Sequence, residues 1–132
     1  MEDLRILVVD DFDTMTHIIR NLLIDLGYSQ ILTAKNGLQA CQVLENNHVD
    51  LIISDWNMPK MTGIELLRKV RETPEWASIP FLMVTAEADK TLIMEAVKAK
   101  VSQYVIKPFT DATLKAKIAS AIANQKKMNI SK

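Results

Sequence analysis

The sequence predicts an α/β fold: a doubly wound, five-stranded parallel sheet with helices on both faces. Five short apolar runs recur along the 132 residues, and helix-like patterns separate each run from the next. Three of the runs are apolar at every position, which is typical of strands that are covered on both faces. The alternation of strand and helix favours parallel pairing, and right-handed crossovers leave only a few doubly wound strand orders.

The five expected strands are short apolar segments bounded by polar residues. The second and fifth have more polar neighbours, among them Gln30 and Lys107, so we expect these two strands at the edges of the sheet. The runs are Ile6–Val9, Ile31–Ala34, Leu51–Ile53, Phe81–Val84 and Tyr104–Ile106.

The expected helices are marked by apolar spacing and by capping residues. The first follows the i, i+3, i+4, i+7 pattern over 15–26 and stops at Gly27, with Asp13 as its candidate N-cap. Thr62 and Glu65 have capping-box spacing at the start of another helix. The others are expected at Leu38–Glu45, Lys90–Lys98 and Asp111–Gln125, followed by a frayed polar tail over 126–132.

The composition is ordinary for a single globular domain spanning residues 1–132. Sixteen basic residues balance sixteen acidic ones, so bulk charge gives no reason to expect nucleic acid or a membrane as a partner. The single cysteine, Cys41, excludes an internal disulfide. The start of the chain lacks the basic region of a signal peptide, and no apolar run approaches the ~18 residues of a membrane span. We therefore expect a cytoplasmic monomer.

Polar side chains stand where four of the five expected strands end. The first run ends in Asp10 and Asp11, and the third in Asp55. The fourth ends in Thr85 and the fifth in Lys107. In a doubly wound sheet these carboxyl ends meet at one edge, where such folds bind ligands. Any one of the five residues alone is more simply interpreted as a turn or cap residue, but five at corresponding positions favour a functional site.

Three carboxylates at one edge need a cation. At a separation of about 5 Å they repel by roughly 3 kcal/mol per pair at an effective dielectric constant of about 20. Oxygen ligands select a hard ion, and magnesium binds carboxylates together with phosphate oxygens. Thr85 is suited to donate a hydrogen bond to a phosphate oxygen, and Lys107 to balance its charge. The chemistry that fits is phosphoryl transfer onto a carboxylate, with Asp55 on a central strand as the candidate acceptor.

An enzyme remains a second hypothesis. A strand followed by Asp11-x-Asp13 resembles the nucleophile motif of haloacid-dehalogenase-type phosphatases, in which Asp11 would be the nucleophile. Against this reading, the chain has no clear later acidic pair and no room for a substrate cap. The two hypotheses differ in which aspartate is modified.

The chain as a whole resembles the receiver domain of two-component response regulators. The segments "ILVVDD", "IISDWNMPKMTG", "MVTAE" and "YVIKPF" carry the resemblance, in order, over nearly all of the sequence. "DDFDTM" and "KPFT" are similar in particular to the single-domain chemotaxis regulators of that family. The resemblance implies a flavodoxin-like (βα)5 fold with strand order 2-1-3-4-5. Receiver domains are themselves examples of the rule for ligand position used above, so that rule is not independent support.

The resemblance also implies the chemistry of the sheet edge. Asp55 would accept a phosphoryl group from a phosphohistidine on a sensor histidine kinase, here a chemotaxis kinase. The chain would not be an enzyme beyond this self-catalysed phosphorylation and dephosphorylation. Mg²⁺ would bind the carboxylates of Asp11 and Asp55 and the backbone carbonyl of Asn57, and it would bind Asp10 largely through water.

Further residues would act on the phosphoryl group itself. By resemblance, Thr85 and Lys107 contact the phosphoryl oxygens, and the Lys107–Pro108 bond is cis. Asn57 and Glu87 would tune hydrolysis, and a dedicated phosphatase is a further possible partner.

The output implied by the resemblance is a binding switch. Thr85 would move toward the phosphoryl group, Tyr104 would rotate inward, and the altered surface would bind the flagellar motor switch protein. A phosphoryl group shifts such an equilibrium only through its different interaction with the two states; moving it from 1:99 to 99:1 takes about 5.5 kcal/mol. A phosphate sink and a non-flagellar target remain alternatives. The partner surface would be lined by Ile93, Val97, Val101, Tyr104 and Lys117.

The sequence departs from chemotaxis regulators next to this surface. Lys100, Val101 and Gln103 stand where that group usually has small residues, often glycine or alanine. We therefore expect Lys100 and Val101 to crowd the partner surface and to weaken motor binding.

Overall fold

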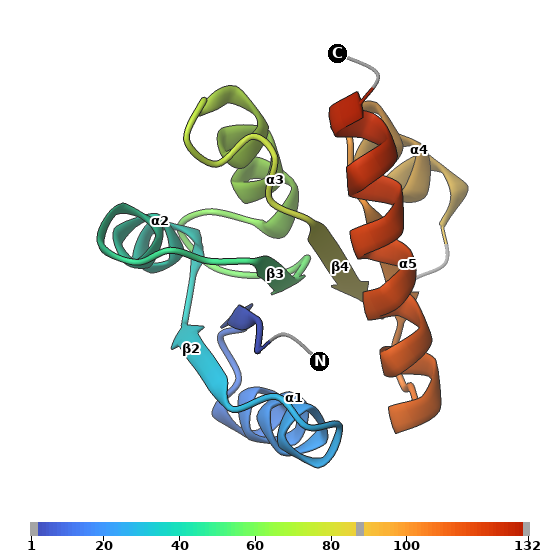
Figure 1. Cartoon of the computed structure of the whole chain (residues 1–132). Coiled ribbons are helices and arrows are strands. Elements are labelled where there is room, and N and C mark those ends of the chain that lie inside the picture. Colours follow the sequence, from blue (N-terminus) through green and yellow to red (C-terminus); the bar gives the residue numbers. More distant parts are fainter. Residues whose placement is uncertain (1–2, 87–88, 131–132) are drawn as a thin grey trace.

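The computed structural model describes residues 3–86 and 89–130, and in them strands and helices alternate throughout (Figure 1). The strands form one parallel sheet in the order β2-β1-β3-β4-β5, which confirms the predicted fold class and places the two more polar strands at its edges. Each observed strand differs from its predicted run by at most two residues at either end. The strands are β1 Arg5–Val9, β2 Gln30–Ala34, β3 Leu51–Asp55, β4 Phe81–Thr85 and β5 Gln103–Ile106.

The helices follow the strands in turn, and two of the predicted helix-end features are present. The capping box of Thr62 and Glu65 is present at the start of α3, and Gly27 follows the end of α1 with a φ of 103°. The helices are α1 Asp13–Asp25, α2 Gly37–Asn46, α3 Gly63–Glu72, α4 Lys90–Lys98 and α5 Asp111–Ile130.

The prediction that Asp13 caps α1 is wrong. Asp13 is the first residue of the helix, and Phe12 occupies the N-cap position without a side-chain capping bond. The backbone N–H of Phe12 instead donates to Oδ1 of Asp10 at 2.9 Å. The carboxylate that accepts a backbone hydrogen bond at the start of this helix is therefore that of Asp10, which directly follows β1.

The prediction of a frayed tail from residue 126 is also wrong for the described part of that segment, since α5 continues to Ile130. Gln125 is buried and lies in contact with α3 and β5 through Arg71 and Ser102. Its side-chain amide also donates to Asn129. These contacts hold the last turns of a helix whose sequence alone is polar.

Two layers of helices cover the sheet. Strand side chains alternate between the faces, so each fully buried strand supplies both layers. On one face the core includes Leu7, Ile52, Phe81 and Met83 of the sheet with residues of α2, α3 and α4. On the other face it includes Ile6, Ile53, Leu82 and Val84 with residues of α1 and α5. This arrangement leaves the carboxyl edge of the sheet open for polar side chains.

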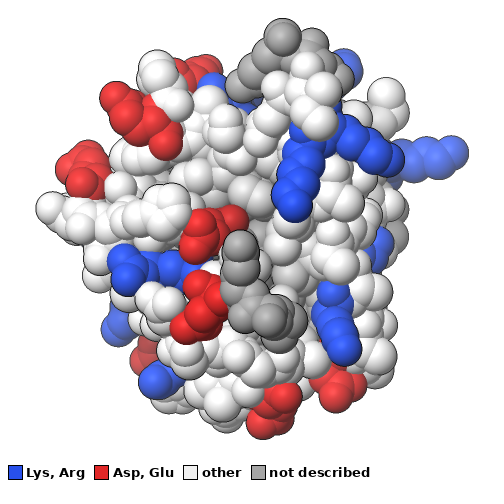
Figure 2. Space-filling model, viewed as in Figure 1, with Lys and Arg blue, Asp and Glu red and all other residues white. Residues whose placement is uncertain are grey.

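Charged side chains of both signs are scattered over the face shown in Figure 2, and neither sign forms one continuous patch there. This distribution agrees with the zero formal net charge of the sequence. Among the helices within residues 3–86 and 89–130, none has both the length and the apolar character needed to cross a membrane.

Candidate functional site

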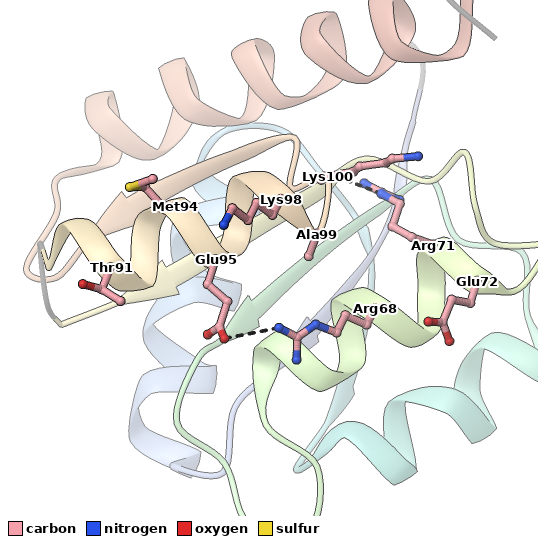
Figure 3. Close-up of a pocket in the computed structure, with 9 residues that line it drawn as sticks. All are labelled: Arg68, Arg71, Glu72, Thr91, Met94, Glu95, Lys98, Ala99 and Lys100. Atoms are coloured by element: carbon pink, nitrogen blue, oxygen red, sulfur yellow. Dashed lines mark hydrogen bonds and ion pairs between the residues drawn. The ribbon is translucent and has the colours of Figure 1, made fainter.

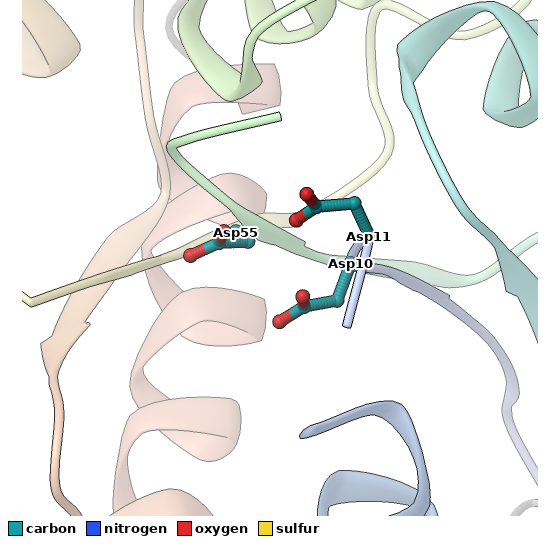
Figure 4. A group of neighbouring side chains, drawn as sticks. All are labelled: Asp10, Asp11 and Asp55. Atoms are coloured by element: carbon teal, nitrogen blue, oxygen red, sulfur yellow. The ribbon is translucent and has the colours of Figure 1, made fainter. Parts of the chain in front are cut away.

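Three carboxylates converge at the carboxyl edge of the sheet. Asp10 and Asp11 follow β1, and Asp55 ends β3, which pairs directly with β1. Each residue offers a carboxylate oxygen, and these oxygens all lie within 4.8 Å of one another. Figure 4 shows the three side chains gathered at the ends of the two strands. The structure thus brings together the acidic residues that the strand ends predicted.

The environment of Asp10 is unfavourable for a charged carboxylate. Its side chain is only 1% exposed, and burial, together with the nearby charge of Asp55, raises its pKa; the bond from the Phe12 N–H acts in the opposite direction. Its Oδ2 is buried and accepts no hydrogen bond. A buried carboxylate oxygen without a donor is costly, and a bound cation would remove that cost.

Lys107 supplies positive charge to the cluster. Its Nζ lies 2.9 Å from Oδ1 of Asp55 and 3.8 Å from Oδ2 of Asp10. The backbone N–H of Lys107 donates to the carbonyl of Thr85, which ties the end of β5 to the end of β4. The Lys107–Pro108 peptide bond is cis, as the resemblance implied. A single ammonium group therefore faces two buried carboxylates from across the sheet.

Of the remaining predicted site residues, the structure describes Thr85 and Asn57. Thr85 is buried at the end of β4, between the strands that carry Asp55 and Lys107. Asn57 is exposed, two residues after Asp55 in the turn that leaves β3. Glu87 lies outside the described residues. Asp13 is 72% exposed at its side chain and is not part of the acidic cluster.

The donor set of this edge fits a hard divalent cation. All of its candidate ligand atoms are oxygens, two of the three carboxylates are buried, and Oδ2 of Asp10 lacks a hydrogen-bond donor. A site of this kind has few protein ligands and leaves room for water and phosphate oxygens, which is the coordination that Mg²⁺ favours.

A close backbone approach at Gly63 packs the start of α3 against the end of β3, and the sequence prediction did not include this residue as part of the site. The Gly63 N–H donates to the carbonyl of Trp56 at 2.8 Å. A Cβ at position 63 would overlap the backbone carbonyl oxygen of Asp55 and would also meet Met83. One feature of the sequence could have indicated this contact. A glycine directly follows the capping Thr62, at a position that tolerates most residue types unless another backbone approaches closely.

The expected partner surface lies on α4, β5 and α5. Tyr104 is half-buried, and the ammonium of Lys117 lies 5.2 Å from the centre of its ring. Val97 is exposed, and Ile93 is half-buried. Val101 is a correction: it is 8% exposed and packs in the core, because the turn after α4 directs it inward. Val101 therefore lies beneath the surface that we expected it to line.

The molecule also has a groove that is separate from the acidic edge. A groove of about 730 Å³ lies between α3 and α4, and none of its lining residues belongs to the site described above. Figure 3 shows the ion pair of Arg68 with Glu95 across it, and the bond from Arg71 to the carbonyl of Lys100 at its end. Arg68, Glu95 and Arg71 thus make contacts within the protein at this groove.

Comparison with known proteins agrees with the geometry. Residues 6–119 match the response regulator receiver domain. The chain belongs to this family. It is 50% identical over 115 residues to the chemotaxis protein CheY of Pseudomonas aeruginosa, covering 87% of this chain and 93% of that protein.

Solved receiver structures have the same fold. The chemotaxis response regulator CheY4 of Vibrio cholerae superposes with a TM-score of 0.84 at 31% identity, covering 91% of this chain and 99% of that one. The receiver domain of the sensor histidine kinase PA1611 of P. aeruginosa, solved with a magnesium ion coordinated in its active-site cleft, has a TM-score of 0.82 at 26% identity. It covers 92% of this chain and 99% of that structure. This receiver domain is thus similar to single-domain chemotaxis regulators over most of its length.

Proposed function

We propose that this receiver domain is phosphorylated on Asp55 and that the phosphoryl group switches a partner-binding surface. The observation that carries the proposal is the position of Asp55, which is buried at the end of a central strand. It lies beside two further carboxylates and 2.9 Å from the Lys107 ammonium. A nucleophilic carboxylate, a cation site and a fixed positive charge are the groups that phosphoryl transfer needs.

Transfer would proceed by attack of a carboxylate oxygen of Asp55 on the phosphorus of a phosphohistidine of the partner kinase. A P–O bond forms, the P–N bond breaks, and its electron pair returns to the imidazole. Mg²⁺ held by Asp10, Asp11, Asp55 and the carbonyl of Asn57 would neutralise the charge that gathers between the carboxylates and the phosphoryl oxygens.

Thr85 and Lys107 would recognise the phosphoryl group once it is attached. Thr85 is the hydroxyl at the end of the neighbouring strand, and Lys107 already lies at the acceptor carboxylate. The hydrolysis rate would depend on Asn57 and Glu87. We expect Asn57→Arg to slow loss of the phosphoryl group by obstructing the attacking water, and an unchanged decay rate would count against this role.

The assignment of the acceptor is tested by identifying the modified residue. We expect Asp55→Asn to abolish labelling by a phosphorylated kinase, while Asp11→Asn weakens labelling through the cation site. Mapping the label to Asp11 instead would contradict the proposal and restore the phosphatase hypothesis.

The proposed output is control of the flagellar motor switch, which is supported by the similarity to chemotaxis proteins named CheY. The test is affinity for the receiver-binding peptide of the motor switch protein, measured with Mg²⁺, with and without beryllofluoride as a phosphoryl mimic. Trp56 is next to the acceptor, so its fluorescence reports occupancy in the same sample. Tighter binding on activation supports motor control. A fluorescence response without binding would instead favour a phosphate sink or a non-flagellar target.

A further inference from the structure

The backbone of Tyr104 faces the open edge of the sheet. β5 is the last strand, so it has a neighbour on one side only. The N–H of Lys107 points toward β4, where it donates to Thr85. Because successive N–H groups of a strand alternate in direction, the N–H of Tyr104, three residues earlier, points to the open side. There it donates to Oε1 of Gln103 at 2.9 Å.

Gln103 connects this edge to α5. Its Nε2 donates to Oγ of Ser120 at 2.9 Å, so one side chain joins the backbone of Tyr104 to the helix. Lys117 lies three residues before Ser120, on the same side of α5, and its ammonium lies over the Tyr104 ring. The helix therefore holds Tyr104 at two points, its backbone and its ring.

The same face of α5 anchors the start of β5 more firmly. Asn124 donates to the carbonyl of Ser102 at 2.8 Å, and Gln125 accepts from the Ser102 hydroxyl at 2.8 Å. Both Ser102 and Gln125 are buried. The contacts at Gln103 and Tyr104 lie nearer to solvent. Among the contacts between α5 and this part of the chain, they are therefore the ones that a local rearrangement breaks at the lowest cost.

We propose that Gln103, Ser120 and Lys117 form a latch that holds Tyr104 in the position seen in this structure and thereby sets the switching equilibrium of this receiver. The inference rests on the proposed function and adds positioning residues to it. Inward rotation of Tyr104 takes the ring away from the Lys117 ammonium, and any change in spacing between β5 and α5 breaks the Gln103 bridge. Contacts made in only one of two states shift the equilibrium between them.

The latch would give a role to a departure expected from the sequence. By the resemblance described above, Gln103 stands where chemotaxis regulators usually have a small residue, and a small side chain could not bridge the strand to the helix. A latch that opposes the active state also lowers the apparent affinity for any ligand that requires that state. Its strength is therefore measurable through a phosphoryl mimic, without the downstream partner.

The test compares beryllofluoride affinity in the presence of Mg²⁺, followed by Trp56 fluorescence. We expect Gln103→Ala and Lys117→Met each to tighten the apparent Kd by about three- to tenfold, the effect of losing one hydrogen-bonded bridge or one cation–π contact. Ser120→Ala removes the Oγ that accepts from Gln103 at 2.9 Å and, more weakly, from Asn124 at 3.5 Å, and it should act in the same direction with a smaller effect. The matched controls are Lys115→Met on the exposed side of α5 and Gln42→Ala on α2, and neither should change the Kd.

A second readout reports the position of Tyr104 directly. The chain has two tyrosines, so fluorotyrosine labelling gives two ¹⁹F resonances, and Tyr28 serves as the internal reference. Without beryllofluoride, the Tyr104 resonance of Gln103→Ala should shift toward its beryllofluoride-bound position. A substitution that affects only the stability of the fold would change the melting temperature without moving this resonance.

The outcomes separate the latch from the proposed function. If the unaltered chain responds to beryllofluoride but the three latch variants bind it with unchanged or weaker affinity, the latch is wrong and the phosphoacceptor stands. If the unaltered chain gives no response, the proposed function fails, and the latch fails with it.

Discussion

Nζ of Lys107 lies 2.9 Å from Oδ1 of Asp55, although the two residues are 52 positions apart in the chain. The pair joins the end of β5 to the end of β3 across β4, and the same ammonium lies 3.8 Å from Asp10. One lysine thus links Asp55 to the strand that carries Tyr104.

Replacing Lys107 should make the fold depend more strongly on Mg²⁺. Lys107→Met leaves buried carboxylates without their ammonium, so we expect a loss of about 2 kcal/mol in the free energy of unfolding without metal. Added Mg²⁺ should stabilise this variant more than the unaltered chain, because both cations neutralise the same carboxylates. Thermal unfolding with and without Mg²⁺ measures this, and equal stabilisation of the two proteins would contradict it.

Lys107→Arg separates charge from position at the same residue. The guanidinium keeps the positive charge but is larger and planar, so it cannot occupy the place of the ammonium. We expect phosphoryl uptake to survive while switching of the partner surface fails. Normal partner binding by the phosphorylated variant would refute this role.

Removing the Asp10 carboxylate should stabilise the metal-free protein. The carboxylate is buried, one of its oxygens has no hydrogen-bond donor, and burial raises its pKa. Asp10→Asn keeps an oxygen for the Phe12 N–H and removes the charge, so we expect a gain of about 1 kcal/mol at neutral pH. The same change should weaken Mg²⁺ binding at least about tenfold. Urea unfolding and a Mg²⁺ titration measure the two effects, and a destabilised variant would argue against electrostatic strain at this site.

The strand ends were predictable because they depend on local pattern and on one topological rule. Apolar runs covered on both faces identify buried parallel strands, and parallel strands bring their carboxyl ends together. Asp10, Asp55 and Lys107 could therefore be grouped from sequence. The roles carried over from the family, such as those of Asn57 and Glu87, remain proposals.

The mistaken predictions have one cause close in sequence and one between distant segments. Asp13 has the right residue type and position for a cap, but the sheet already supplies Asp10 to the same helix entry. The end of α5 is polar in sequence and becomes ordered through Arg71, which is 54 positions away from Gln125. Local periodicity contains no information on such pairs, so the burial of Val101 and the extension of α5 could not be predicted from it.

The close approach at Gly63 predicts a large effect for a small substitution. In Gly63→Ala the added methyl group would overlap the backbone of Asp55, so the start of α3 must move. We expect a loss of about 2–4 kcal/mol in stability and a weaker Trp56 response to beryllofluoride. Gly37→Ala is the comparison variant, since its methyl group would be crowded as well, by the side chain of Met61 from Cβ to Sδ, but none of its nearest atoms belongs to Asp55. An equally weakened Trp56 response in both variants would show that contact with the Asp55 backbone is not the cause.

The half-buried side chain of Arg71 predicts a second large effect, away from the acidic cluster. Burial lowers its pKa to about 10, so it is charged at neutral pH, and its guanidinium donates only to neutral oxygens. The acceptors are the carbonyls of Lys100, Ala77 and Ile79, the Ser102 hydroxyl and the Gln125 amide oxygen.

We expect Arg71→Met to reduce stability by about 2–4 kcal/mol, since it leaves buried acceptors without donors. Arg71→Lys should be nearly as harmful, because a single ammonium cannot reach all of these oxygens. Arg68→Met removes an exposed ion pair with Glu95 and should cost less than about 1 kcal/mol. Urea unfolding of the three variants ranks their losses in stability. A mild effect of Arg71→Lys would show that the positive charge matters more than the several N–H donors of the guanidinium.

Two helices of this chain end in the same hydrogen-bonded motif, with different residues at its left-handed position. After α1, Gly27 donates to Ile24 and Tyr28 to Leu23. After α4, Lys100 donates to Val97 and Val101 to Ala96. These are Schellman motifs, in which the residue after the cap has positive φ, here 103° for Gly27 and 67° for Lys100.

Because a Cβ is strained at positive φ, we expect Lys100→Gly to stabilise the protein by roughly 0.5–1 kcal/mol. The reciprocal change, Gly27→Lys, should destabilise it by about 1 kcal/mol or more. The expected crowding of the partner surface by Lys100 predicts a separate effect, a rise in motor-peptide affinity in Lys100→Gly. Urea unfolding measures the first effect and peptide binding the second. A gain in stability without a gain in affinity would show that Lys100 strains the turn but does not obstruct the partner.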